Sequence, residues 1–206
     1  MLVKSLVDGQ EWIWVRIPKT ATRAYRTVFQ MAGDEPHSHL SYNEAIEKYG
    51  NVGKAFSVIR NPVDRLKSGI THDVDEFKKI YPNRQYPSWM LDIELLCDVF
   101  FNILGENCQI RNKQAYYALS WEAGMMAEVL KTQASAVNHP EVKVFKYENL
   151  EEFNKWINNT LGLNASYVEV NGASDYAKYN WLDFSNPRFT ELCKLIYKED
   201  YEVYKY

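Results

Sequence analysis

Residues 55–69 read AFSVIRNPVDRLKSG, a short apolar run that stops at Asn61-Pro62 and continues into a helical pattern. A run of this length next to a turn signal is typical of a buried strand. Asn61 is a good N-cap, and Pro62 suits the first position of a helix. Apolar residues then recur at helical spacing: Val63, Leu66 and Ile70. The stretch therefore predicts a buried strand over Ala55–Arg60 that passes directly into an amphipathic helix.

The same strand-then-helix pattern occurs at two other places in the chain. Residues 12–17 read WIWVRI, and residues 142–147 read VKVFKY, each of which predicts a buried strand. After the first, apolar residues share one face of a predicted helix: Ala21, Ala24, Tyr25, Val28 and Ala32. After the second, Asn149 and Glu152 have the spacing of a capping box, and the predicted helix runs to Gly162, a natural C-terminal stop.

Repeated strand–helix units predict an α/β fold with a central, mainly parallel sheet flanked by helices. Between the strand–helix unit that begins at Ala55 and the one that begins at Val142, the stretches WMLDIELLCDVFFNIL and QAYYALSWEAGMMAEVL predict a helical insertion. The length of 206 residues suits a single domain over residues 1–206. Open parallel sheets bind ligands at the carboxyl ends of their strands. The stretches RIPKT and VIRNP both fall at such ends.

Composition and charge limit the class of protein. The chain is 46% hydrophobic and 25% charged, as globular proteins are, and its formal net charge is −3. A general nucleic-acid binder carries a strong basic excess, so we expect no nucleic-acid partner and only a local anion site. No run suits a signal peptide or a membrane span, so we expect a soluble, cytoplasmic protein without a membrane partner. The sequence leaves the oligomeric state open.

Three widely spaced cysteines form neither a zinc pattern nor a disulfide framework. Cys97 and Cys193 fall on apolar helical faces, which favours buried free thiols in a reducing compartment.

The turn RIPKTATRA, Arg16–Ala24, follows the first predicted strand. Helix-opening backbone N–H groups, together with Lys19, Thr20 and Thr22, would form a cradle for an oxyanion. Such a cradle needs no glycine, provided that the turn does not demand positive φ. The usual nucleotide loop, G-x-x-x-x-G-K-[ST], has two glycines and ends on its lysine. Three interpretations stay open: a degenerate phosphate loop, another anion site, or an ordinary strand–helix corner.

The end of the central predicted strand adds a second set of basic and hydroxyl groups. Arg60 stands at the strand end, and Arg65 and Ser68 share a face of the next helix because they are three residues apart. A guanidinium and a hydroxyl that converge there suit a second phosphate. The alternative is that Arg60 or Arg65 pairs with Asp64 or another carboxylate.

His37 and His39 lie one residue apart in EPHSHLSY. In an extended segment, residues i and i+2 point to the same side, so both imidazoles would face one cleft. Histidine is the usual general base near neutral pH. A zinc pair, which lacks an obvious third ligand nearby, and plain surface histidines are the alternatives.

Taken in order, IPKT, then H-x-H, then VIRNPxxRLxS resemble the motifs of PAPS-dependent sulfotransferases, whose sulfuryl donor is 3′-phosphoadenosine 5′-phosphosulfate. The chain is most similar to the carbohydrate type, and within it to the heparan and uronyl 2-O-sulfotransferases. The resemblance is strongest over Trp12–Gly69 and continues weakly in VFKYENLEEF and YKEDYEVY. It implies a P-loop-NTPase-like sulfotransferase fold. It also implies transfer of a sulfuryl group from PAPS to a hydroxyl of a carbohydrate or small-molecule acceptor.

The resemblance gives each residue of the two turns a role. Lys19 would contact the 5′-phosphate and the bridging oxygen, and so stabilise the leaving group. The other residues of the 5′-phosphosulfate loop would be Thr20, Ala21, Thr22 and Arg23. Arg60 and Ser68 would hold the 3′-phosphate. Many relatives have a small residue or serine where Arg23 stands, so the role of Arg23 stays open.

The resemblance also implies the catalytic residues. His37 and His39 fall on the histidine pair associated with catalysis, one of them as the base, and Arg16 stands where the 2-O-type enzymes carry an active-site arginine. An acceptor alcohol needs a base to take its proton, and the leaving phosphate oxygen needs positive charge, so this account requires no metal. Two alternatives stay open: a divergent P-loop kinase or NTPase, and a binding protein that kept the fold without turnover.

Overall fold

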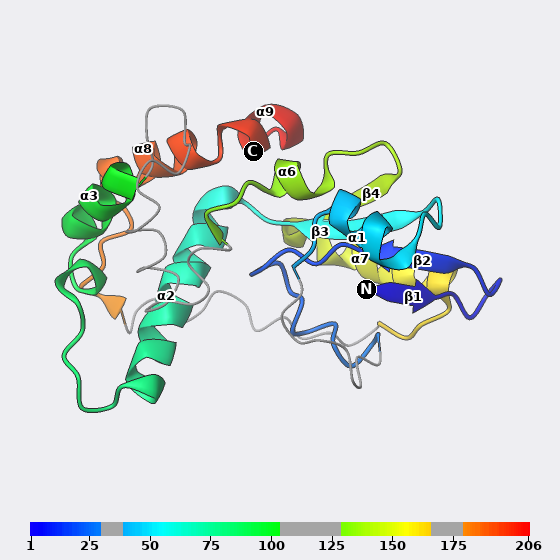
Figure 1. The fold of residues 1–206 in the computed structure, drawn as a ribbon, viewed down its shortest axis with the longest axis horizontal. Helices are drawn as coiled ribbons and strands as arrows, with labels where there is room; N and C mark the ends of the chain where they lie inside the picture. The colour runs from blue at the N-terminus through cyan, green and yellow to red at the C-terminus, as the bar shows by residue number, and fades with distance from the viewer. Residues whose placement is uncertain (30–38, 104–128, 166–178) are drawn as a thin grey trace. The chain divides into compact units, whose positions relative to one another are not determined.

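The computed structural model describes residues 1–29, 39–103, 129–165 and 179–206 (Figure 1). The chain divides into two compact units. Unit 1 comprises Met1–Asn61 and Gln133–Gly172, and unit 2 comprises Pro62–Thr132 and Ala173–Tyr206. Each unit has a hydrophobic core of its own.

Unit 1 is built on a four-stranded mixed sheet in the order β1-β2-β3-β4. β1 (Leu2–Lys4) runs antiparallel to β2 (Glu11–Trp14), whereas β3 (Ala55–Ile59) is parallel to both β2 and β4 (Val142–Lys146). The predicted α/β class with a mainly parallel sheet is thus confirmed. The antiparallel edge strand β1 was not predicted, because three residues are too few to show a periodicity.

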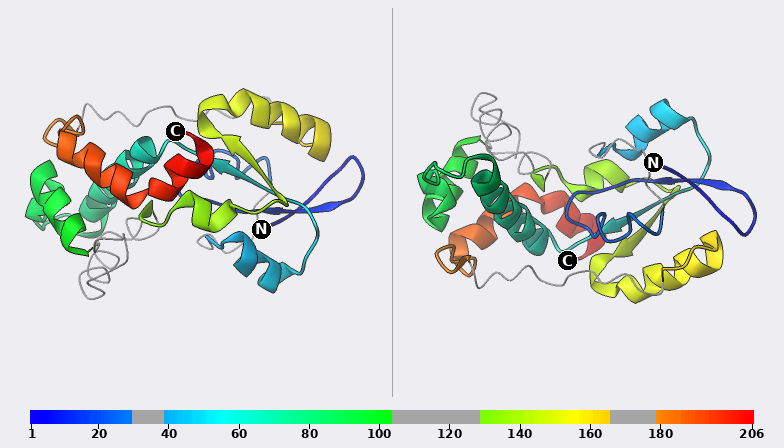
Figure 2. Two further views of the ribbon diagram at one scale, coloured as in Figure 1. Left: turned by 90° about the horizontal axis from the view of Figure 1, so that it is seen from above. Right: turned by 90° about the horizontal axis from the view of Figure 1, so that it is seen from below.

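Helices cover both faces of this sheet, as the two views of Figure 2 show. On one face α7 (Leu150–Trp156) buries Phe153 against Phe56 and Phe145 of the sheet. On the other lie α1 (Tyr42–Tyr49) and α6 (Gln133–Val137). α1 begins with a capping box, in which the side chains of Ser41 and Glu44 each accept the other's backbone N–H. Because β2, β3 and β4 are parallel, their carboxyl ends lie together at the same end of the sheet.

The segment after β2 differs from its prediction. β2 ends at Trp14 rather than Ile17, and residues 18–29 form consecutive turns instead of the expected helix. The backbone N–H groups of Ala24 and Tyr25 both donate to the Ala21 carbonyl oxygen, which mixes two helical hydrogen-bond spacings. Ala21, Ala24, Tyr25 and Val28 of the predicted apolar face nevertheless pack into the core, where Tyr25 is fully buried, and Ala32 lies outside the described residues. Apolar spacing therefore identified the buried residues but not their backbone conformation.

The segment after β4 follows its prediction more closely. A 3-10 turn, Tyr147–Asn149, leads into α7, and a π-helical turn, Ile157–Leu161, ends at Gly162 with φ of 67°. The predicted stop at Gly162 is confirmed. The predicted capping box is wrong, because the Asn149 side chain caps no backbone N–H and donates instead to the Glu152 carboxylate. Asn149 already belongs to the 3-10 turn and so does not adopt an extended cap conformation.

Unit 2 is helical in its described part. It contains α2 (Pro62–Ile80), a 3-10 turn (Ser88–Met90), α3 (Ile93–Ile103), α8 (Pro187–Ile196) and α9 (Lys198–Tyr204). The predicted helix start at Asn61-Pro62 is confirmed, and α8 begins in the same way, with Asn186 as its N-cap and Pro187 as its first residue. The first half of the predicted insertion is helical in α3, and all but the last two residues of the second half lie outside the described residues. No helix in the described ranges is long and apolar enough to cross a membrane.

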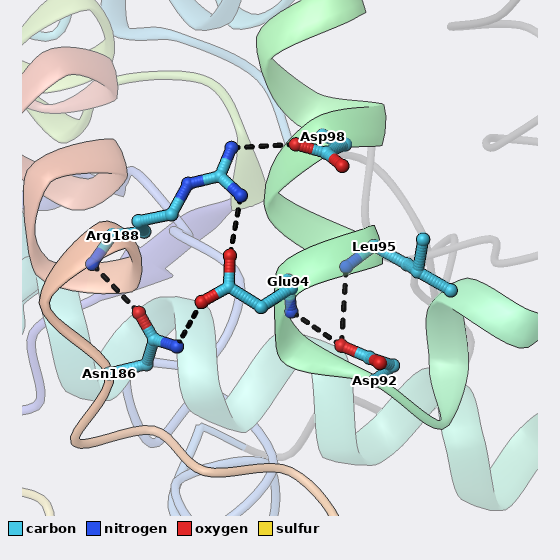
Figure 3. Close-up of polar contacts among 6 residues, drawn as sticks. All are labelled: Asp92, Glu94, Leu95, Asp98, Asn186 and Arg188. Carbon is cyan, nitrogen blue, oxygen red and sulfur yellow. Dashed lines mark hydrogen bonds and ion pairs between the residues drawn. The ribbon is translucent and has the colours of Figure 1, made fainter.

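A polar network joins α3 to α8 within unit 2 (Figure 3). The Arg188 guanidinium donates to Glu94 and to Asp98 on α3. Asn186 accepts the Arg188 backbone N–H as the N-cap of α8, and its amide donates to the Glu94 carboxylate. Asp92 in turn accepts the Glu94 and Leu95 N–H groups at the start of α3. The two helix starts are therefore fixed to each other by side chains.

Candidate anion-binding site

The carboxyl ends of β2, β3 and β4 carry the candidate site, because the three strands are parallel neighbours. β2 leads into the turn that contains Lys19, β3 leads to Arg60, and β4 leads to Tyr147. All three segments belong to unit 1.

The turn after β2 uses its threonine hydroxyls internally. Thr20 Oγ1 and Thr22 Oγ1 both donate to the Ile17 carbonyl oxygen, at 2.8 and 3.0 Å. Because these protons are engaged, the hydroxyls are not oriented to donate to a phosphate. The backbone N–H groups of residues 20–23, by contrast, donate no hydrogen bond within the described part of the chain. The donors that this turn offers a ligand are therefore mainly those of its backbone.

The backbone of the turn is strained at two residues. Lys19 and Ala21 each have φ of 66°, which costs a non-glycine residue roughly 1–2 kcal/mol. The assumption that this turn needs no positive φ is therefore wrong. Left-handed residues next to right-handed ones can point successive N–H groups into one concavity, the arrangement of an anion-binding nest. Backbone outliers of this kind cluster at functional sites.

Arg60 is the central cation of the site and is only 8% exposed. Its Nη1 donates to the Lys19 carbonyl oxygen at 3.4 Å, and its Cζ lies 4.4 Å from the centroid of the Tyr147 ring. Its Nε is buried and has no hydrogen-bond partner. In the described part of the chain no carboxylate pairs with Arg60. A buried guanidinium with an unused N–H favours an anionic ligand.

Arg65 and Ser68 lie in unit 2, on α2. Arg65 is fully buried, donates from Nη1 to the Lys131 carbonyl oxygen at 2.8 Å and lies over the Tyr197 ring. Its contacts are those of a structural residue. Ser68 is half-buried on α2. Because Arg60 belongs to unit 1, the joint contact of Arg60 and Ser68 with one phosphate stays a prediction.

His39 precedes α1, and its Nδ1 lies 3.2 Å from the Arg16 carbonyl oxygen. A carbonyl oxygen only accepts hydrogen bonds, so this contact puts the imidazole proton on Nδ1 and leaves Nε2 as the basic nitrogen. Arg16 itself is buried two residues after the end of β2, and Arg23 is exposed on the following turn. His37 lies outside the described residues.

Three residues of the site were not predicted. The Tyr147 ring stacks on Arg60, the Glu148 carboxylate accepts the Asn61 N–H at 2.6 Å, and Gln133 pairs with the main chain of Arg60. Strand register offered a signal for Tyr147: Ile59 pairs with Lys146, so the next residues along the two strands adjoin. No sequence signal pointed to Gln133.

Within residues 1–29, 39–103, 129–165 and 179–206, no group of three or more histidine, cysteine, aspartate or glutamate side chains is arranged to hold a metal ion. The site as described offers backbone donors, Lys19, a buried guanidinium and one oriented imidazole. Comparison of the chain with models of protein families, with curated proteins and with solved structures found no match, so a function must be inferred from these residues.

Proposed function

We propose that the chain is a PAPS-dependent O-sulfotransferase, with the sulfotransferase form of the P-loop fold, that acts on a hydroxyl of a carbohydrate or small molecule. The observation that carries the proposal is the convergence of the Lys19 turn, Arg60 and His39 at the carboxyl ends of β2 and β3. A phosphorylated donor needs cationic and N–H groups, and an alcohol acceptor needs a base. The resemblance in motif order identifies the donor as PAPS.

The donor set of unit 1 fits two phosphates. The open N–H groups of residues 20–23 and the Lys19 ammonium would hold the 5′-phosphate and the bridging oxygen. Arg60, whose Nε has no hydrogen-bond partner among the described residues, would hold the 3′-phosphate. PAPS supplies the sulfuryl group when it is bound. Lys19 stabilises the negative charge that grows on the bridging oxygen as the bond to sulfur breaks.

His39 is the base in this proposal. Its Nε2 takes the acceptor's hydroxyl proton while the new S–O bond forms, and the imidazole becomes an imidazolium. The Nδ1–H donated to the Arg16 carbonyl oxygen holds the ring in the basic tautomer and stabilises that positive charge. His37 is the other member of the predicted pair, and variants of both histidines, made separately and together, test which one acts.

The alternative of a P-loop kinase or NTPase has less support. The usual loop of that class has two glycines and ends on its lysine, whereas RIPKTATRA has no glycine and carries Lys19 early in the turn. The binding protein without turnover differs from the enzyme only in the absence of sulfuryl transfer, which an assay with PAPS and a panel of alcohol acceptors measures.

Ligand-induced thermal stabilisation tests the proposal. Adenosine 3′,5′-bisphosphate should stabilise the protein strongly, whereas adenosine 2′,5′-bisphosphate and AMP should do so weakly. At a ligand concentration 100 times its Kd, the unfolding free energy rises by about 2.7 kcal/mol. Lys19→Ala should reduce the shift, and Lys194→Ala, which removes an exposed lysine of unit 2, should leave it unchanged. Equal stabilisation by all three nucleotides would contradict the proposal, and Mg²⁺-dependent stabilisation by ATP would favour the NTPase.

A further inference from the structure

The backbone N–H and C=O groups of Arg60 are hydrogen-bonded by a side chain and not by a neighbouring strand. Gln133 Oε1 accepts the Arg60 N–H at 2.8 Å, and Gln133 Nε2 donates to the Arg60 carbonyl oxygen at 2.8 Å. A strand residue directs its N–H and its C=O to the same side, so one side-chain amide presents the pattern that a neighbouring strand would present. Gln133 is fully buried and is the first residue of α6. The strand geometry of β3 therefore extends one residue past Ile59.

The residue after Arg60 is held from another element. The Asn61 N–H donates to the Glu148 carboxylate at 2.6 Å, from the turn that follows β4. Since Ile59 pairs with Lys146, Arg60 continues the register opposite Tyr147. Neighbouring side chains in register lie on the same face of a sheet, and here the Tyr147 ring lies against the guanidinium.

The guanidinium itself is held by weak contacts. The Nη1 contact with the Lys19 carbonyl oxygen is 3.4 Å long, at the limit of a hydrogen bond. The contact with the Tyr147 ring is not a hydrogen bond and is therefore less directional. The direction in which the side chain leaves β3 therefore depends on the main chain. Two short, buried hydrogen bonds from Gln133 fix that main chain.

We propose that Gln133 is a positioning residue for anion binding: it holds the Arg60 main chain extended, so that the guanidinium lies on Tyr147 with its buried Nε–H left unpaired for an anion. The identity of that ligand as an adenosine bisphosphate rests on the proposed function, whereas the positioning of Arg60 does not. An apolar residue at position 133 leaves the N–H and C=O of Arg60 buried and unpaired, and the junction must then rearrange.

The test compares Gln133→Leu with Val137→Ala, a variant in the same helix that removes buried methyl groups without touching Arg60. Two quantities are measured at a temperature at which both variants are folded. One is the Kd of adenosine 3′,5′-bisphosphate. The other is the NMR signal of the Arg60 Nε–H group, assigned by its loss in Arg60→Lys. Gln133→Glu keeps the acceptor for the Arg60 N–H, removes the donor and adds a carboxylate, so it replaces Gln133→Leu for the Arg60 signal only, if that variant does not fold.

We expect Gln133→Leu to shift and broaden the Arg60 Nε–H signal and to weaken binding about 10-fold, the equivalent of one hydrogen bond to a charged group. Val137→Ala should lose thermal stability while its Kd and its Arg60 signal stay at the wild-type values. Equal weakening in both variants, or an unchanged Arg60 signal in Gln133→Leu, would overturn the positioning role. If the wild type binds no bisphosphate, the proposed function fails, and the Arg60 signal alone decides the role of Gln133.

Discussion

At the scale of single residues, Arg60 and Arg65 are both buried but are satisfied differently. Arg65 donates a short hydrogen bond to the Lys131 carbonyl oxygen. Among the described residues, the Arg60 guanidinium has a buried Nε without a partner, one long hydrogen bond to the Lys19 carbonyl oxygen and a ring contact with Tyr147. Burial of an incompletely paired charge costs free energy, so Arg60 contributes little to stability unless an anion is bound. A role in ligand binding therefore explains the buried Arg60 better than a role in stability does.

Methionine substitutions separate the two arginines. We expect Arg60→Met to leave the unfolding free energy without ligand equal to the wild type or higher, and to abolish stabilisation by adenosine 3′,5′-bisphosphate. Arg65→Met should lose about 1–3 kcal/mol, because it removes the hydrogen bond from the buried guanidinium to the Lys131 carbonyl oxygen. Urea denaturation measures both. A loss in Arg60→Met as large as that in Arg65→Met would show that Arg60 is a structural residue.

The strained turn makes a second prediction at this scale. Glycine adopts positive φ without penalty, so Ala21→Gly should keep or raise the unfolding free energy. Ala24 lies in the same turn region and has no positive φ, so Ala24→Gly should lower the unfolding free energy by about 0.5–1 kcal/mol. Urea denaturation of the two variants side by side is the measurement. Equal destabilisation would mean that residue 21 is not left-handed in solution.

At the scale of elements, charge fixes the start of α3 to the start of α8. The pKa of Glu94 lies below its ordinary value because the carboxylate accepts hydrogen bonds from Asn186 and then from Arg188, and these outweigh repulsion from Asp98. Hydrogen bonds to Asp98 and then to Glu94 raise the pKa of Arg188. The network is exposed, so salt screens it.

This network should make the stability of unit 2 depend on pH in the acid range. A carboxyl group whose folded pKa is depressed contributes stability above its unfolded pKa of 4.5 and loses that contribution as pH falls through the lower folded value. The difference in unfolding free energy between the wild type and Glu94→Gln should therefore be constant near neutral pH and shrink below about pH 4.5. Urea denaturation at several pH values checks this. A difference that does not change with pH would exclude Glu94 as the group responsible.

At the scale of the whole molecule, the single domain over residues 1–206 stays a prediction, and buried thiols offer a test. Cys97 and Cys193 are fully buried free thiols of unit 2, and burial raises their pKa values to about 11 and about 12. They should react with a thiol reagent only when unit 2 unfolds. The expectation of buried free thiols is confirmed for these two; Cys108 lies outside the described residues.

Thiol labelling in a Cys108→Ser chain measures whether the units unfold together. If the chain is one cooperative domain, adenosine 3′,5′-bisphosphate should slow labelling of Cys97 and Cys193, although Arg60 belongs to unit 1. The factor by which labelling slows should correspond to the rise in unfolding free energy that the ligand causes in the thermal measurement. An unchanged labelling rate, in the presence of a clear thermal shift, would show that unit 2 unfolds independently.

The sequence predicted those features whose signals are local. Apolar runs located β2, β3 and β4, and the pair Asn61-Pro62 located the start of α2. The helix expected after β2 was wrong because non-glycine residues such as Lys19 give no sign of positive φ. Gln133 was missed because its hydrogen bonds reach 73 residues along the chain to Arg60, and only the folded chain brings the two together.

Gly69 of α2 constrains how this chain can evolve. A Cβ atom at this position would lie 2.7 Å from Val129 Cγ2, closer than packed atoms come, and valine has little freedom to turn away. Any larger residue at position 69 therefore requires a smaller one at position 129. In an aligned set of sequences with this fold, the two positions should covary, and Gly69→Ala should be rescued by Val129→Ala although neither variant touches the anion site.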